Sequence, residues 1–239
     1  MRTFVEYYDD FFPTSEEQMK FFSESAKDYF APVKFLNIGS NTGSLALLLA
    51  KQGFDVTGTE MWQELLDSAS LKRRTQLLSI RFFKLSSSEI TRYLGKDFYN
   101  IVFNLDGRIP LLGSRDKVKN FFKDAKTLLT KNGKLILAIC NFDYLKNSNK
   151  NTITKESSRA VFKCDFDFSK KDTALLTQKV IHNGDKEFTV LENIPVYPIS
   201  KEELITFSKA AGFSKVNFYS DYTKNPATES TEILLCEFS

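Results

Sequence analysis

The stretch 33–60, VKFLNIGSNTGSLALLLAKQGFDVTGTE, restricts the possible folds more than any other part of the chain. Its first apolar run, 33–38, is short and ends at Gly39, as expected for a strand buried on both faces. Apolar residues at helical spacing follow over 45–50, Gly53 ends this predicted helix, and a second strand is predicted over 54–58. The order strand, glycine turn, helix and strand predicts an α/β unit with parallel strands.

Such a unit suits a nucleoside ligand. The helix N-terminus presents free N–H groups, a glycine admits the ligand to the backbone, and an acid at the tip of the second strand can bind both ribose hydroxyls. About 20 residues separate Gly39 from Glu60, the spacing found in dinucleotide folds. The fingerprint G-x-G-x-x-G is not met, because Asn41 stands where its second glycine would be. A dehydrogenase is therefore the least favoured alternative.

The turn itself reads Asn37-Ile-Gly39-Ser-Asn41-Thr-Gly43. It resembles motif I, acid-x-Gly-x-Gly-x-Gly, of the class I S-adenosylmethionine (SAM)-dependent methyltransferases. Two of the three glycines are present, while Asn37 takes the place of the acid and Asn41 that of the middle glycine. Asparagine tolerates a left-handed backbone better than most residues, so Asn41 is compatible with the turn.

A second passage supports this resemblance. The segment 127–139, TLLTKNGKLILAI, is similar to the passage that precedes the fifth strand in these methyltransferases. The resemblance runs in continuous order from Tyr8 to Cys140, and the tail 196–239 looks like that of bacterial small-molecule methyltransferases. It implies a Rossmann-like α/β fold with a seven-stranded, mainly parallel sheet and a reversed C-terminal hairpin.

The resemblance also implies SAM as the cofactor. Aromatic N-terminal segments such as YDDFFP, 8–13, lie over the cofactor in related enzymes, although a hydrophobic plug would have the same composition. Residues after the ribose acid often stack on adenine, which makes Trp62 a further candidate, although Met and Trp there are also ordinary core residues. The expected cofactor-binding residues are Tyr8, Asn37, Gly39, Ser40, Asn41, Gly43, Glu60, Met61, Ser86, Ser87 and Asn104.

The expected substrate side rests on fewer signals. Polar residues follow the predicted strand 98–103, at the strand ends where ligands bind in open α/β sheets. In-line methyl transfer depends on positioning and requires no catalytic side chain, so no catalytic residue is assigned. If the acceptor is a hydroxyl, Asp106 or the only histidine, His182, could be the base. The substrate candidates are Asp106, Arg108, His182 and Tyr197.

The chain is expected to form one domain built from four parts: a helical cover over 1–30, the cofactor-binding core over 31–145, an antiparallel lid or substrate insertion over 146–197, and a last helix with two strands over 198–239. The Asn- and Lys-rich stretch 141–159 is predicted to be an exposed loop. Strands are expected in the insertion over 160–168, 174–182 and 187–195, with a hairpin turn at Asn183-Gly184-Asp185. Ser200 and Glu203 form a capping-box pattern before the helix 201–211.

Composition limits the remaining choices. The formal net charge of +3 is too small to indicate nucleic-acid binding. Three widely spaced cysteines form neither a disulfide framework nor a metal site, which favours a reducing, cytoplasmic location. Neither a signal peptide nor a membrane-spanning segment is recognised in the sequence. A monomer or a homodimer would be compatible with this composition.

The expected function is methyl transfer to a nitrogen or oxygen atom of a small molecule. The turn after the fourth predicted strand reads NLDG, 104–107, which lacks the motifs of enzymes that methylate adenine or cytosine in nucleic acids. A non-catalytic binding or scaffold protein is an alternative, because Asn37, Asn41 and the serines at 86–88 depart from the family pattern together. An RNA methyltransferase is a further alternative, based on LKRR at 71–74 and the Lys-rich stretch 146–155.

Overall fold

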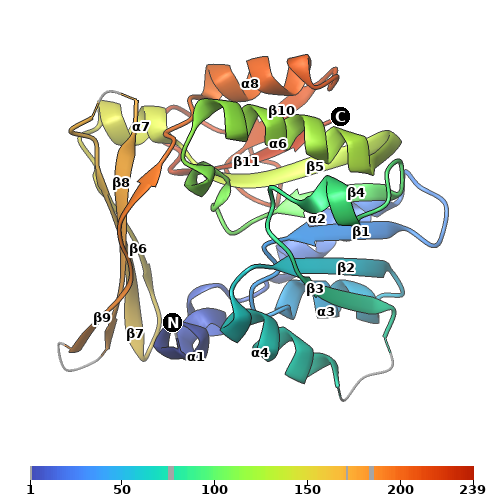
Figure 1. The fold of residues 1–239 in the computed structure, drawn as a ribbon, viewed down its shortest axis with the longest axis horizontal. Coiled ribbons are helices and arrows are strands. Elements are labelled where there is room, and N and C mark those ends of the chain that lie inside the picture. The colour runs from blue at the N-terminus through green and yellow to red at the C-terminus, as the bar shows by residue number, and fades with distance from the viewer. Residues whose placement is uncertain (1, 75–77, 171, 183–185) are drawn as a thin grey trace.

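The chain folds into a seven-stranded sheet and a separate four-stranded sheet, which stand side by side (Figure 1). The computed structural model describes residues 2–74, 78–170, 172–182 and 186–239. No helix in these ranges is long and apolar enough to cross a membrane.

The seven-stranded sheet has the strand order β10-β11-β5-β4-β1-β2-β3. The first five strands along the chain run parallel, whereas β11 is antiparallel to both of its neighbours, β5 and β10. This arrangement confirms the predicted Rossmann-like sheet with a reversed C-terminal hairpin. The strands are β1 (Lys34–Ile38), β2 (Asp55–Glu60), β3 (Ile80–Lys84), β4 (Tyr99–Asn104), β5 (Leu129–Cys140), β10 (Val216–Tyr219) and β11 (Ile233–Phe238).

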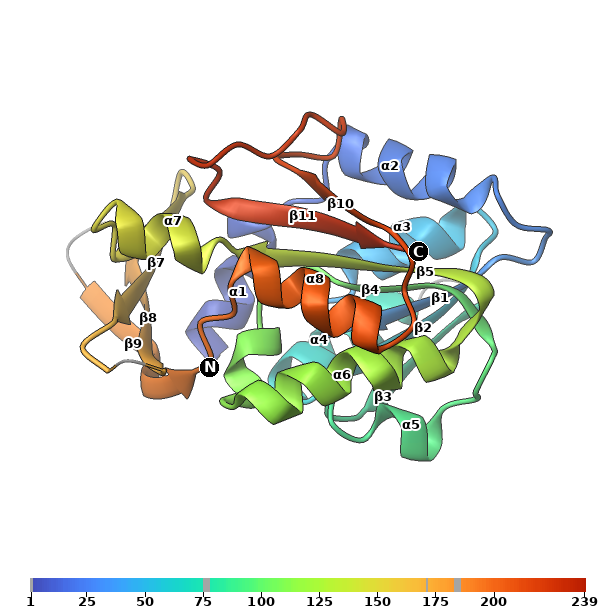
Figure 2. The same cartoon turned by 90° about the horizontal axis from the view of Figure 1, so that it is seen from above.

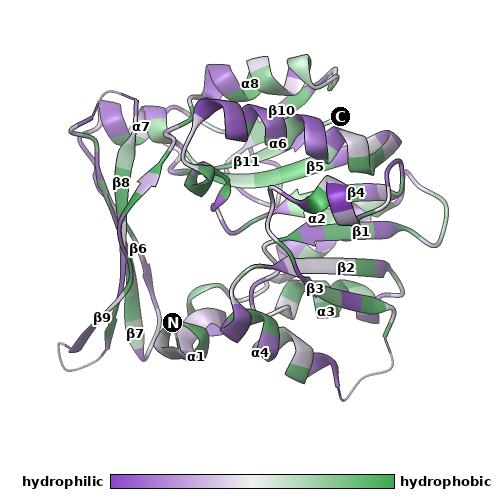
Figure 3. Ribbon diagram, viewed as in Figure 1, coloured by the Kyte–Doolittle hydropathy of each residue, from purple (hydrophilic) through white to green (hydrophobic). Residues whose placement is uncertain are grey.

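Helices cover both faces of this sheet (Figure 2). One face carries α2 (Glu16–Ala26) and α3 (Ser44–Lys51), whose buried side chains share a core with β1, β2 and β4. The other face carries α5 (Ile90–Tyr93), α6 (Arg115–Leu128) and α8 (Lys201–Ala210). Because both faces are covered, the middle of the central strands is apolar, with Phe35 and Leu36 of β1 and the stretch 101–103 of β4 fully buried (Figure 3).

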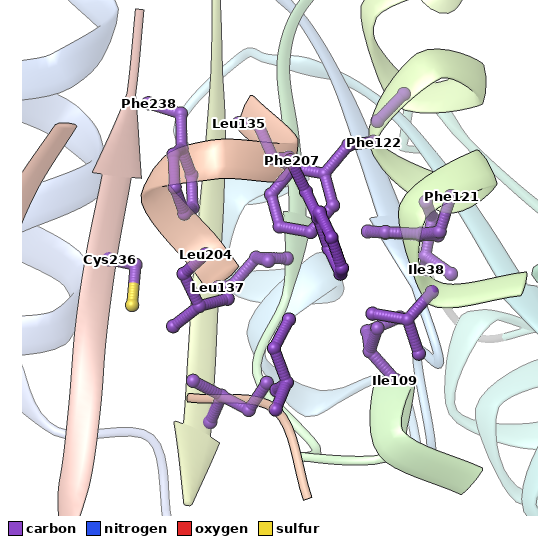
Figure 4. Close-up of a cluster of buried hydrophobic side chains, with 14 of the residues drawn as sticks. Ile38, Ile109, Phe121, Phe122, Leu135, Leu137, Leu204, Phe207, Cys236 and Phe238 are labelled. Atoms are coloured by element: carbon purple, nitrogen blue, oxygen red, sulfur yellow. The ribbon is translucent and has the colours of Figure 1, made fainter. Parts of the chain in front are cut away.

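The core beneath α6 and α8 is rich in phenylalanine (Figure 4). Phe122 of α6 lies with its ring centroid 5.3 Å from that of Phe238 on β11, in an edge-to-face arrangement, and 6.3 Å from that of Phe207 on α8. All three side chains are buried. The predicted capping box at the start of α8 is present, since the side chains of Ser200 and Glu203 each accept from the other residue's backbone N–H.

The second sheet is inserted after β5 and has the order β6-β7-β8-β9, antiparallel throughout. The predicted strands over 160–168, 174–182 and 187–195 are confirmed, and the turn at 183–185 lies outside the described residues. The insertion comprises α7 (Phe142–Asn147), β6 (Thr152–Glu156), β7 (Ala160–Asp167), β8 (Ala174–His182) and β9 (Lys186–Val196).

The prediction of an exposed loop over 141–159 is wrong. The short helix α7 begins at Asn141, whose side chain accepts from the backbone N–H of Tyr144, and it buries Phe142 and Leu145. The following strand β6 pairs with β7 and forms one edge of the insertion sheet. Both elements are short and their apolar residues are few, so the polar composition of the stretch concealed them.

Candidate functional site

The turn between β1 and α3 takes a left-handed backbone at three positions. The φ angles are +70° at Gly39, +52° at Asn41 and +76° at Gly43. The side chain of Asn41 donates to the carbonyl of Gly39 at 2.7 Å, which stabilises the turn from within. The prediction that asparagine replaces the middle glycine without disrupting the turn is therefore confirmed.

The carboxylate of Glu60, at the end of β2, lies next to this turn. Its side chain is fully buried, and it accepts from the backbone N–H groups of Asn41 at 3.0 Å, Met61 at 2.8 Å and Trp62 at 2.9 Å. Three backbone donors from two loops thus hold one carboxylate at the carboxyl edge of the sheet.

Arg108, which begins the short 3₁₀ helix η1 (Ile109–Leu112), points its guanidinium into the same place. Its Nη2 lies 2.6 Å from Glu60 Oε2, and its Nε lies 2.5 Å from Asp106 Oδ2. Its Cζ lies 4.5 Å from the ring centroid of Trp62. Burial alone would lower the pKa of Arg108, but Asp106 and Glu60 more than offset this effect and raise it. The guanidinium is therefore charged at any physiological pH.

Asp106, in the turn after β4, is the second acid of this cluster. It accepts from the Asn104 side chain at 2.7 Å and from the backbone N–H of Arg108 at 2.9 Å. Burial raises the pKa of Asp106 above its ordinary value, and the charge of Glu60 adds to this effect, while Arg108 opposes it. The cluster of Glu60, Asp106 and Arg108 thus combines two acids with one fixed cation.

The N-terminal helix α1 (Arg2–Phe11) packs against α4 (Gln63–Arg73) and β7 and closes the site from one side (Figure 1). Tyr8 lies among the charged residues, since burial, Asp106 and Glu60 all raise the pKa of its hydroxyl. Its neighbour Asp9 accepts from the side chains of Lys72 at 2.5 Å, Thr42 at 2.5 Å and Ser44 at 2.9 Å. These bonds attach α1 to the N-terminus of α3 and to α4.

A pocket of about 550 Å³ lies between α1, the carboxyl ends of β1, β4 and β5, and the insertion sheet. At one end it is lined by the glycine turn, Asp106 and Arg108. At the other end its wall is one face of the insertion sheet, because residues two apart on a strand point to the same side. The side chains on that face are Ile153 and Lys155 of β6, Phe162, Cys164 and Phe166 of β7, and Leu176 and Gln178 of β8.

The expected cofactor residues divide into three groups. Tyr8, Asn37, Gly39, Ser40 and Asn41 line the pocket. Glu60 and Asn104 do not line it, but each makes a hydrogen bond to a residue that does: Glu60 lies behind Arg108, and Asn104 holds Asp106. The remaining expected residues, Gly43, Met61, Ser86 and Ser87, lie away from the pocket lining.

Gly43 has a different role from the one expected. A Cβ on this residue would come within 2.8 Å of the side chains of Ala69 and Phe82, so its missing side chain allows α3 to approach α4 and β3. Gly39, by contrast, does face the pocket, because a Cβ there would lie 2.0 Å from Asp106 Oδ2. Only the first glycine of the motif therefore leaves space on the ligand side.

Only two of the four expected substrate residues lie at the pocket. Asp106 and Arg108 line the pocket, whereas His182 and Tyr197 do not. His182 lies at the end of β8, paired with Lys186, and its ring is 5.5 Å from that of Tyr7 on the side of α1 away from the pocket lining. The hydroxyl of Tyr197 donates to Glu203 at 2.6 Å, in the helix cap of α8.

The residues that the sequence did not single out come mainly from α1 and from the insertion. Asp9, Thr42, Cys140, Cys164 and Gln178 all line the pocket. Thr42 and Asp9 could have been found from the motif and from the YDDFFP pattern, because each is adjacent to an expected residue. Cys164 and Gln178 carried no such signal, since only the strand register brings them to the pocket.

The polar atoms in the pocket and directly behind its lining fit SAM. Ser40 Oγ and Asn104 Oδ1, at the carboxyl ends of β1 and β4, are buried and have no hydrogen-bond partner among the described residues. Gly39 has no side chain on the pocket side of the turn, where Asp106 lies against it, and Glu60 supplies a carboxylate at the strand tip. Unpaired polar atoms beside a glycine turn and an acid match the needs of a nucleoside with an amino-acid tail.

Comparisons with known proteins agree with this geometry. A family profile described as a methyltransferase domain matches residues 36–137. A protein of Geobacillus sp. (strain WCH70), described as a candidate methyltransferase, is 29% identical over 106 residues, which cover 44% of this chain and 42% of that protein. The match therefore spans less than half the length of this curated relative.

Solved structures resemble the chain over almost its whole length. The CcbJ methyltransferase of Streptomyces caelestis superimposes with a TM-score of 0.80 at 20% identity, over 98% of this chain and 95% of that one. CalS10 of Micromonospora echinaspora, an amino pentose methyltransferase solved with SAM bound, gives 0.66 at 12% identity, over 100% and 97%. Residues 36–137 thus match a methyltransferase-domain profile, and the whole chain has the fold of these solved methyltransferases.

Proposed function

We propose that this chain transfers the methyl group of SAM to a nitrogen or oxygen atom of a small molecule. The observation that carries the proposal is the buried carboxylate of Glu60, held by three backbone N–H groups beside the glycine turn at the edge of the pocket. A carboxylate in this position is suited to a ribose diol. Asn37 and Ser40, which line the pocket, would hold the amino-acid tail.

The far end of the pocket supports a small acceptor with an apolar body. Phe162, Phe166 and Leu176 are each at most 6% exposed and form one wall, with the polar groups Gln178 and Cys164 between them. Gln178 donates to the sulfur of Cys164 at 3.3 Å. Burial raises the pKa of Cys164 to about 12, so its thiol is neutral at physiological pH. These five residues are uncharged, and Lys155 of β6 adds one basic side chain to the same face.

The pocket size and the structural neighbours point in the same direction. A volume of about 550 Å³ has to hold both the cofactor and the reacting part of the acceptor, which favours a compact acceptor over a macromolecule. CalS10 acts on an amino pentose. An enclosed site built from α1 and the insertion sheet is consistent with acceptors of comparable size.

When bound, SAM supplies an electrophilic methyl carbon on a sulfonium. The residues of the chain would contribute by position: Tyr8 and α1 cover the site and exclude water, and the apolar wall orients the acceptor. The acceptor atom would form a bond to this carbon as the carbon–sulfur bond breaks. The electron pair of the broken bond would stay on sulfur, so that S-adenosylhomocysteine leaves. A proton then leaves the acceptor. Asp106, one of the acids that line the pocket, would accept this proton, and burial raises its pKa above the ordinary value.

Calorimetric titration with SAM and S-adenosylhomocysteine (SAH) tests the cofactor site. We expect binding by the wild-type protein and at least about 10-fold weaker binding by Glu60→Gln, which keeps the shape of the side chain but loses its charge. Glu64→Gln, an exposed acid on α4, is the matched control and should bind like wild type. No binding by the wild-type protein at millimolar ligand would leave the non-catalytic scaffold in its place.

The acceptor class needs a separate measurement. SAM labelled in its methyl group is incubated with the protein and with either the low-molecular-weight or the macromolecular fraction of a cell extract. We expect label to enter the low-molecular-weight fraction only. Label that enters the macromolecular fraction and is released by ribonuclease would favour the RNA methyltransferase instead.

A further inference from the structure

Arg108 already makes the contacts with Glu60 and Asp106 that a bound ligand would make. Its Nη1 and Nη2 donate to the two carboxylate oxygens of Glu60 at 3.2 and 2.6 Å, and Nη2 also donates to Asn41 Oδ1 at 3.1 Å. Its Nε donates to Asp106. The guanidinium thus joins both acids of the site and one side chain of the glycine turn.

Glu60 has little capacity left for another donor. Its Oε1 accepts from the backbone of Met61 and Trp62 and from Arg108, and its Oε2 accepts from the backbone of Asn41 and from Arg108. A carboxylate offers about four acceptor positions, and these contacts use all of them. Two ribose hydroxyls can bind Glu60 only if the two bonds from Arg108 are broken.

The guanidinium also occupies the space in front of the turn. A Cβ added to Gly39 would lie 3.1 Å from Nη2 of Arg108, and the Trp62 ring lies 4.5 Å from the guanidinium on another side. The space that the glycine leaves on the pocket side is therefore filled by Asp106 and Arg108. A ligand cannot lie against this turn while the side chain keeps this position.

We propose that Arg108 is an internal competitor of the cofactor, and that SAM binds only after the guanidinium has left Glu60. This inference rests on the proposed function and adds a determinant of cofactor affinity to the same site. The free energy of the contacts between Arg108 and Glu60 is subtracted from that of cofactor binding, because only the fraction of molecules with Arg108 displaced is competent to bind. Removing the competitor should tighten binding, the opposite of removing a cofactor ligand.

A test has to distinguish the effect of removing the charge of Arg108 from the effect of removing its block of the binding site. Glu60, Asp106 and Arg108 together carry a formal charge of about −1, and a variant without the arginine would carry about −2. This change attracts a cationic ligand such as SAM even if Arg108 blocks nothing. SAH has no sulfonium charge, so a gain in its affinity reports the removal of the block.

The experiment compares SAM and SAH binding by calorimetry in wild type, Arg108→Met and Arg108→Lys. Methionine keeps an unbranched apolar stem but is shorter and lacks the guanidinium, and lysine keeps the charge with a single donor group. We expect Arg108→Met to bind SAH at least about 10-fold more tightly than wild type and Arg108→Lys to be intermediate. Arg115→Met, which removes an exposed arginine from a salt bridge with Glu203, should bind both ligands like wild type.

Stability provides a second readout for the same variants. Arg108→Met leaves two buried carboxylates without their cation, so its melting temperature without ligand should fall below that of wild type. The rise in melting temperature on adding SAH should be larger than in wild type, since tighter binding stabilises the folded state more. If Arg108→Met does not fold, Arg108→Lys decides the question by the direction of its affinity change.

Each outcome is decisive. Weaker or unchanged SAH binding by the folded variants would overturn the proposal and leave the methyltransferase function intact. A gain confined to SAM would show an effect of charge alone and would also overturn it. Absence of binding by every variant, including wild type, would reject the proposed function itself, and this inference with it.

Discussion

The ring of Phe162, on β7 of the insertion sheet, lies 5.1 Å from the ring of Phe4 on α1. The rings of Phe11 and Phe12 lie 5.7 and 5.5 Å from the same side chain. One phenylalanine of the insertion thus joins three aromatic residues of the N-terminal segment. Because Phe162 also lines the pocket, the same contact closes the site and shapes its far wall.

We predict that Phe162→Ala lowers the free energy of unfolding by about 3–5 kcal/mol, the range for removing a buried phenylalanine. Urea denaturation measures this change, and faster amide hydrogen exchange in α1 would locate it. Val161→Ala is the control, since the neighbouring residue points to the opposite face of β7 and is only partly buried. An equal loss in both variants would mean that the cluster has no special role in holding α1.

Glu60→Ala should destabilise the protein even without ligand. The substitution leaves three backbone N–H groups and the guanidinium of Arg108 without their acceptor, which costs about 3 kcal/mol or more. Glu60→Gln retains one acceptor oxygen and should lose less. The emission of Trp62, the only tryptophan, follows unfolding in urea. A Glu60→Ala variant as stable as wild type would show that the buried acid is present for binding alone.

The fold was predictable because each step of it is encoded locally. Short apolar runs that end in glycine predicted β1 and its turn, and Asn41 could be recognised as compatible with the left-handed position that the structure shows. The capping box before α8 was equally local. A reversed C-terminal hairpin was implied by the resemblance of the tail and is observed in β10 and β11.

The arrangement of the site was less predictable, because it depends on register and side-chain direction. Nothing in the spacing of Asp106 and Arg108 indicates that the guanidinium turns back onto Glu60. His182 was a candidate from its identity alone, and its place at the end of β8 follows from the pairing with β7 and β9. Gly43 matched the motif, but the packing of Ala69 and Phe82 determines its role.

The pocket cysteines should be unreactive in the folded protein. Burial raises the pKa of Cys140 and of Cys164 to about 12, so almost no thiolate is present at pH 8. We predict that a thiol-specific disulfide reagent labels them slowly at pH 8 in the native state and fast in urea. The label read by mass spectrometry separates these two from Cys236, which is also buried. Rapid native labelling of Cys164 would show that the insertion sheet opens readily.

The raised pKa of Cys140 and Cys164 also determines how the stability of the protein changes with pH. A thiol with a raised pKa contributes stability that is fully present below its unfolded pKa of about 8.5 and is lost as pH rises toward the folded value. Wild type should therefore lose stability between about pH 8.5 and pH 12 more steeply than a variant with both Cys140 and Cys164 replaced by alanine. Parallel alkaline profiles would contradict this assignment.

Asp9 should make the attachment of α1 sensitive to acid. Burial alone would raise the pKa of Asp9, but the hydrogen bonds from Lys72, Thr42 and Ser44 lower it below its ordinary value. An acid with a depressed pKa contributes stability that is present above its unfolded pKa of about 3.9 and is lost as pH falls through the lower folded value. Because the pair with Lys72 is partly exposed, its contribution is about 1 kcal/mol or less.

The measurement is the difference in unfolding free energy between wild type and Asp9→Asn from pH 3 to pH 7. We expect the difference to be constant above about pH 5 and to shrink below about pH 4, as the wild-type carboxylate takes up its proton. Asp172→Asn, an exposed acid beyond β7, is the control and should show no such profile. A difference that grows on acidification would mean that Asp9 is held in its neutral form, and that α1 is attached by its aromatic contacts instead.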